Sequence, residues 1–99
     1  MSIASTLIKG TEFSGTSKLV AITATIATAD DVIELTEATH GIKAITHVVG
    51  VNVLAPVAGF TDAGASSSGL TITLKAMEGD GTDATVFNRQ VGVTVLGTI

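Results

Sequence analysis

Residues 42–54, IKAITHVVGVNVL, are a long run rich in β-branched side chains, preceded by a glycine and followed by Ala55 and Pro56. Alternate positions give two faces, with Ile45, His47, Val49, Val51 and Val53 on one and Thr46, Val48, Gly50, Asn52 and Leu54 on the other. Because both faces are largely apolar, the pattern predicts a central strand, covered on both sides or bent between two sheets. Gly50 is the place where such a strand can bulge or kink.

Three further segments alternate between apolar and polar residues, as half-buried strands do. Residues 18–28 (KLVAITATIAT) place Val20, Ile22, Ala24 and Ile26 on one face. Residues 70–76 (LTITLKA) place Leu70, Ile72, Leu74 and Ala76 inward, and residues 90–96 (QVGVTVL) place Val91, Val93 and Val95 inward. We therefore expect a strand in each segment, with one face in the core.

The connection after residue 28 combines a turn, a strand and one turn of helix. Ala29 and Asp30 predict a short turn, and residues 31–35 (DVIEL) predict the return strand. A solvated turn accounts for Asp30 and Asp31, and Glu34 is interpreted as a solvent-facing strand residue. Residues 36–40 predict a single helical turn, capped by Thr36 at its start and closed by a left-handed Gly41.

The segments between the later strands carry weaker signals. Residues 57–62 (VAGFTD) predict at best a weak strand, and residues 63–69 (AGASSSG) have the composition of a flexible loop. Residues 78–83 (EGDGTD) predict an acidic turn, and residues 85–88 either a short strand or an irregular connection.

Strands spaced about ten residues apart, with turn signals between them, are typical of all-β domains. We expect a compact antiparallel β-sandwich or small barrel of about 6–8 strands with one short helical turn, formed by residues 18–99.

Residues 1–17 differ from the rest and are interpreted as an N-terminal arm or edge strand. Four apolar residues there follow no sustained period: Ile3, Leu7, Ile8 and Phe13. Gly10 and Gly15 are expected to interrupt any longer element. Two alternatives stay open: an ordinary first strand over residues 3–9, or an extended arm that becomes ordered only on a neighbouring subunit.

The composition bounds the class of partner. Charged residues make up only 14% of the 99 residues, about half of the usual share. Either much of the surface faces other protein chains, or Thr and Ser serve as the solvent-facing residues. A net charge of −4, scattered basic residues and the absence of Trp and Tyr disfavour nucleic-acid binding. No segment has the length and composition of a membrane span, so we expect a soluble protein.

No motif predicts a catalytic, metal or cofactor site. The turn at residues 78–83 lacks the spacing of a calcium loop, and the absence of cysteine excludes thiolate ligands. His40 and His47 share no evident metal-ligand spacing, and His47 is interpreted as a partly buried or interface residue. The serine-rich segments at 14–17 and 66–68 have no accompanying base. We expect no enzyme activity and no cofactor.

Residues 30–53 (DDVIELTEATHGIKAITHVVGVNV), 69–87 (GLTITLKAMEGDGTDATVF) and 90–97 (QVGVTVLG) together resemble small virion proteins of tailed phages, in particular capsid decoration (cement) proteins. The resemblance covers roughly residues 30–97 and is one of pattern, without signature residues. It implies a β-sandwich or barrel on the capsid exterior, often a trimer at local three-fold positions, that braces adjoining capsomers. The expected partners are a major capsid protein and further copies of the chain in a homotrimer, assembled in the host cytoplasm, with no nucleic acid and no membrane.

On this resemblance, six apolar residues are candidates for the protein interface: Ile3, Leu7, Ile8 and Phe13, and with less support Phe60 and Phe87. Two alternatives stay open. One is another virion β-module, such as a tail-tube, head–tail or fibre-associated piece. The other is a domain that binds a small ligand or the host surface.

Overall fold

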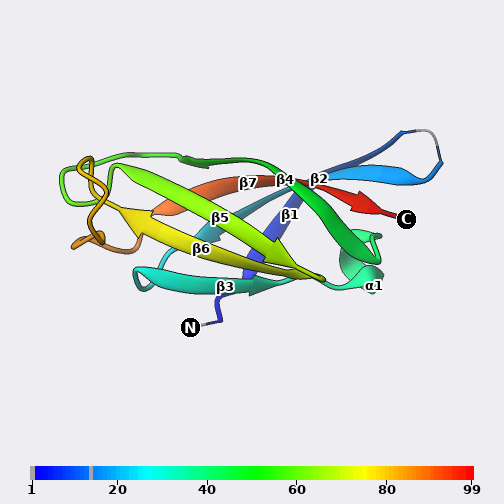
Figure 1. Cartoon of the computed structure of the whole chain (residues 1–99), viewed down its shortest axis with the longest axis horizontal. Helices are drawn as coiled ribbons and strands as arrows, with labels where there is room; N and C mark the ends of the chain where they lie inside the picture. Colours follow the sequence, from blue (N-terminus) through cyan, green and yellow to red (C-terminus); the bar gives the residue numbers. More distant parts are fainter. Residues whose placement is uncertain (1, 14) are drawn as a thin grey trace.

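The computed structural model describes residues 2–13 and 15–99, apart from the side chain of Phe13. Within that part, the chain forms two antiparallel sheets and one short helix (Figure 1). The elements are β1 (Ser5–Phe13), β2 (Ser17–Thr25), β3 (Asp30–Glu34), α1 (Glu37–His40), β4 (Ala44–Val53), β5 (Asp62–Ser68), β6 (Thr71–Met77) and β7 (Gln90–Thr98). Sheet 1 has the order β1-β2-β7-β4 and sheet 2 the order β3-β6-β5, so the predicted all-β sandwich is confirmed.

The core lies between the two sheets. The inward residues of the alternating segments are buried to 5% exposure or less: Val20, Ile22, Ala24, Ile26, Ile72, Leu74, Ala76, Val91, Val93 and Val95. Leu70 packs against them and is partly buried. Removing apolar surface from water contributes about 25 cal/mol per Å², which fixes which face of each strand turns inward. The alternation in these segments therefore predicted the core correctly.

β4 is an edge strand of sheet 1 and the inner strands are β2 and β7, so the prediction of a central strand at residues 42–54 is wrong. β7 pairs with β2 along one side and with β4 along the other, which leaves β4 at the edge of the sheet. The order of strands depends on which distant segments pair. A strand's own composition does not determine that order.

Two bulges explain why the sequence of β4 looks apolar on both faces. The register against β7 shifts between Ile45 and His47, and again between Val48 and Gly50. An inserted residue exchanges the faces of the residues that follow. The side chains of β4 that pack against the core are therefore Ile45, Val48, Val51 and Val53. Gly50 does lie at a bulge, as predicted, but His47 is exposed and Val49 is 54% exposed.

β3 crosses to sheet 2 and pairs with β6, so it is not the hairpin partner of β2 that the sequence predicted. The two sheets are joined by backbone hydrogen bonds at both edges. The N–H of Ile3 donates to the carbonyl of Val32 at 2.9 Å, and the N–H of Ile45 donates to the carbonyl of Gly69 at 2.8 Å. The sandwich is therefore partly closed along both sides.

Residues 62–68 form β5, an edge strand paired with β6, so the prediction of a flexible loop at residues 63–69 is wrong. The segment is made of Ala, Gly and Ser, which carry little strand preference of their own. Its partner β6 supplies the hydrogen-bonding ladder, and Ala63 and Ala65 pack against the core. Pairing thus overrides local composition here.

The predicted helical turn is confirmed at α1. The hydroxyl of Thr36 accepts the N–H of Thr39 at 3.2 Å. Gly41 closes the turn at φ 75° and donates its N–H to the carbonyl of Glu37 at 2.8 Å. Ile42 follows at once and is fully buried, packed on the bare backbone of Gly97 in β7.

The N-terminal segment leaves sheet 2 after Ile3 and becomes β1, the outer strand of sheet 1. β1 runs to Phe13, so Gly10 does not interrupt it and instead faces Val20 of β2. The far end of the β1–β2 hairpin projects beyond the other strands (Figure 1) and contributes to extents of 42 × 21 × 19 Å. The predicted boundary between the N-terminal segment (residues 1–17) and the domain (residues 18–99) falls at the first residue of β2.

Candidate interaction surface

The solvent side of sheet 1, termed here the sheet 1 outer face, is defined by the pairing register. Three rows cross it from β1 to β4: Thr11–Leu19–Leu96–His47, Lys9–Ala21–Thr94–Gly50 and Thr6–Thr23–Gly92–Asn52. Each β2 and β7 position in these rows is flanked along its strand by a residue whose side chain enters the core. The strand pleat therefore turns these rows outward.

This face is almost free of charge. None of the nine Asp and Glu residues of the chain lies in its rows, and Lys9 on the outer strand is its one charged residue. The outer face of sheet 2 differs, because Asp30, Glu34 and Lys75 all lie there. Charged residues are therefore distributed unevenly, because the rows of the sheet 1 outer face hold one lysine and no carboxylate.

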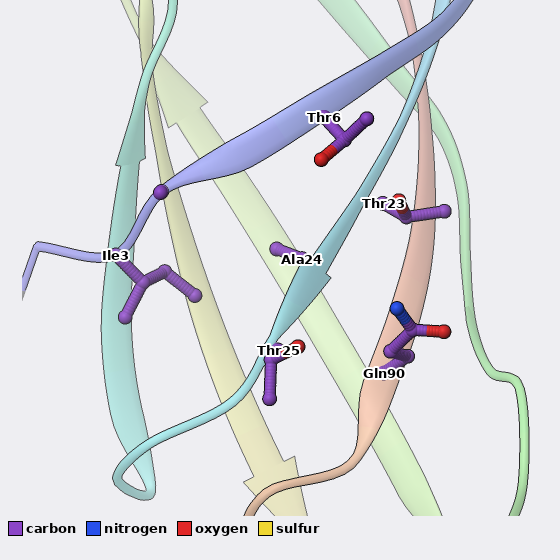
Figure 2. A pocket seen from close by; sticks show the side chains of 7 residues that line it. Ile3, Thr6, Thr23, Ala24, Thr25 and Gln90 are labelled. Atoms are coloured by element: carbon purple, nitrogen blue, oxygen red, sulfur yellow. The ribbon is translucent and has the colours of Figure 1, made fainter.

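A cavity of about 380 Å³ hollows one end of the sheet 1 outer face. It is lined by Ile3, Ala4, Thr6, Thr23, Ala24, Thr25 and Gln90. Figure 2 shows Thr6, Thr23, Thr25 and Gln90 around the hollow beside β2, with Ile3 on the side of β3. The lining combines hydroxyl and amide groups with small apolar side chains and contains no ionisable group.

Among the described side chains of β1, two apolar ones are exposed. Leu7 is 38% exposed and Ile8 is 61% exposed. The register against β2 shifts between Leu7 and Lys9, so Ile8 is the inserted residue of a bulge. A bulge and a lysine on an edge strand hinder pairing with a further strand. The exposed side chains of β1, and not its free backbone edge, are therefore the groups available for contact.

The structure separates the six predicted interface residues. Leu7 and Ile8 are exposed, while Ile3 is partly buried against the core. Phe60 has 0% exposure and belongs to the core, and Phe87 packs against it. The side chain of Phe13 lies outside the described part of the chain. In an irregular segment the sequence does not predict whether an apolar side chain is buried or exposed. The side chain of Phe60 is buried in the core.

Asp31 is a buried residue that sequence reasoning placed in a solvated turn. It has 0% exposure, and its carboxylate accepts the N–H of Ala27 at 2.7 Å and the N–H of Thr28 at 3.0 Å. The hydroxyl of Thr28 donates to its other oxygen. Burial raises the pKa of Asp31, but the hydrogen bonds from Thr28 and Ala27 favour the charged form more strongly, so the pKa lies below 3.8.

Strand alternation could have predicted that Asp31 is buried. Asp31 lies two and four residues before the buried Ile33 and Leu35, so all three side chains share one face. Its carboxylate holds the turn through which the chain passes from sheet 1 to sheet 2. The role of Asp31 is therefore structural.

Exposed charged and hydroxyl groups interact around Lys75 and within the acidic turn. The ammonium of Lys75 lies 2.7 Å from Asp83 and 3.0 Å from Asp30, and hydrogen bonds to Asp83 and then Asp30 raise the pKa of Lys75. In the acidic turn, Thr82 donates its hydroxyl to Asp80 at 2.6 Å and lowers the pKa of Asp80. Lys75 thus ties the β2–β3 turn and the acidic turn to β6.

The two histidines lie in different surroundings. His40 is buried at 5% exposure, and its Nδ1 lies 3.0 Å from the N–H of Thr36. His47 is exposed at the edge of sheet 1, so the partly buried alternative is wrong and the interface alternative stays a prediction. Across residues 2–13 and 15–99, no three His, Asp or Glu residues lie close enough together to hold a metal ion.

No helix in the described part of the chain is long and apolar enough to cross a membrane. Comparison with protein-family models, with curated proteins and with solved structures finds no match to the chain.

Proposed function

We propose that the chain is a structural virion protein, a decoration (cement) subunit that binds the outside of a phage head and stabilises contacts between neighbouring capsomers. The observation that carries the proposal is the apolar pair Leu7 and Ile8, 38% and 61% exposed on the outer strand. Exposed apolar side chains that lie together mark interaction sites more often than single exposed apolar residues do. The main partner on this proposal is a major capsid protein.

The surface suits many weak contacts better than one strong contact. The chain has no Trp or Tyr, and these residues together with Arg dominate interface hot spots. A shell presents many identical sites, and copies linked to each other gain avidity without stronger contacts. The homotrimer implied by the resemblance would supply that linkage, at positions on the capsid exterior.

The test is binding to phage heads assembled without the protein. A Leu7→Ser and Ile8→Ser double variant should lower head occupancy roughly tenfold or more, since burying each apolar side chain is worth about 1.5–3 kcal/mol. Val49→Ser is the matched control, because Val49 is also an exposed apolar residue at a bulge, on β4 at the opposite edge of sheet 1. Occupancy that is unchanged in the double variant would contradict the proposal.

The competing function is a tail-tube, head–tail or fibre-associated module. It predicts rings or tubes that form from the purified chain without heads. Electron microscopy of the concentrated protein separates the two proposals, because a decoration subunit assembles regularly only on a shell.

A further inference from the structure

We infer that the sheet 1 outer face packs against the same face of a second copy of the chain. This inference goes beyond the proposed function and does not depend on it. The features that carry it are the absence of carboxylates from this face, its hydrogen-bonding groups, its shape and its area.

Charge selects a second copy over a charged partner. The chain has a net charge of −4, so two copies repel each other unless their carboxylates face away from the contact. All nine carboxylates lie outside the rows of the sheet 1 outer face. A single lysine there also gives too little positive charge to hold a polyanion.

The polar groups of the face are self-complementary. Thr6, Thr23 and Thr94 carry hydroxyls, and each hydroxyl both donates and accepts. A surface of hydroxyls can therefore satisfy an identical surface, whereas a surface of carboxylates or ammonium groups cannot. A two-fold contact requires this property, because the same patch is present on both sides.

The shape of the face agrees with an antiparallel two-fold pair. Leu19 and Leu96 lie side by side in the row at one end, and the hollow beside Thr25 and Gln90 lies at the other end. The two ends are six residues apart along β2, roughly 20 Å at about 3.3 Å per residue. A two-fold axis across the strands places the leucines of each copy over the hollow of the other.

The area of the face lies near the lower limit for a specific contact. Strands of nine residues and a width of four strands give a face of about 30 by 19 Å, or roughly 1,100 Å² buried over two copies. Specific interfaces bury about 1,200–2,000 Å², and about 1,000 Å² is the lower limit. The pair should therefore be weak and reversible in solution, and should form at high concentration or where copies are held close together.

Light scattering after size exclusion, over a range of concentrations, tests the pair with two matched variants. Thr94→Glu places carboxylates at the centre of the face in both copies and should weaken dimerisation at least tenfold. Thr73→Glu places the same charge on the outer face of sheet 2 and should change the dissociation constant of the dimer less than twofold. A monomer at all concentrations up to about 1 mM would overturn the inference. A trimer without two-fold contacts would also overturn it, yet would leave the decoration proposal standing.

Spin labels give a second readout, the distance between equivalent positions in the two copies, and introduce no charge. The chain has no cysteine, so Thr94→Cys and Thr73→Cys each carry one label per copy. Four stacked sheets about 10 Å apart place the Thr94 labels across one spacing and the Thr73 labels across three, about 30 Å. A Thr73 distance shorter than the Thr94 distance would show that another face is used.

Discussion

Replacing Asp31 tests how the chain passes from one sheet to the other. The Asp31 carboxylate is fully buried and accepts three hydrogen bonds, from the N–H groups of Ala27 and Thr28 and from the Thr28 hydroxyl. Asp31→Ala removes the acceptor and leaves all three donors. Leaving a buried donor unsatisfied costs about 1–3 kcal/mol, and water can reach the exposed Ala27. We therefore expect the free energy of unfolding to fall by about 2–4 kcal/mol.

Asp31→Asn is the matched control for this prediction. The amide oxygen can still accept the two backbone N–H groups, and the Thr28 hydroxyl can donate to the carbonyl of Asp30, 3.1 Å away, while accepting from the new amide group. Asp31→Asn should lower the free energy of unfolding by at most about half as much as Asp31→Ala does. Urea unfolding followed by circular dichroism at neutral pH measures both variants.

The same site predicts a dependence on pH. The pKa of Asp31 is lower in the folded protein than its ordinary value of 3.8. Its charged form therefore stabilises the fold fully above about pH 4, and that contribution is lost as the pH falls through the folded pKa. The Asn variant should lose less stability than the native protein below pH 4. An alanine variant within about 0.5 kcal/mol of the native protein, or an unchanged acid response in the asparagine variant, would refute the reasoning.

Three further predictions concern packing and turns. Gly97→Ala should destabilise the fold by about 1–3 kcal/mol, because the new Cβ would lie 2.7–2.8 Å from the Ile42 side chain. Gly50→Ala is the control, because a Cβ there has nothing within 4 Å, and it should change the urea midpoint little. Phe60→Ala should lower the free energy of unfolding by about 3–5 kcal/mol, and a folded variant that only loses binding would contradict its place in the core. Gly41→Ala should lower the melting temperature, because φ 75° strains any side chain, whereas an unchanged melting temperature would argue against the left-handed cap.

The parts of the fold that were predicted correctly depend on neighbours in the sequence. Val20, Ile22 and Ile26 alternate with polar or small residues, so burial of one face fixes their direction. Thr36 and Gly41 cap a helical turn through bonds to residues within four positions. The candidate interface was predicted only in part, since Leu7 and Ile8 are exposed but Phe60 and Phe87 pack into or against the core.

What the sequence by itself determined is therefore the class of fold, the inward faces of the regular strands and the helical turn. Only the tertiary structure decided that β4 lies at the edge of its sheet, that residues 62–68 form a strand, and that Asp31 is buried. The physical reason is that strand order and bulges arise from hydrogen bonds between segments far apart in the chain, and one inserted residue reverses the faces beyond it. The carboxylate-free outer face of sheet 1 arises in the same way, because its rows bring together residues from four separate strands.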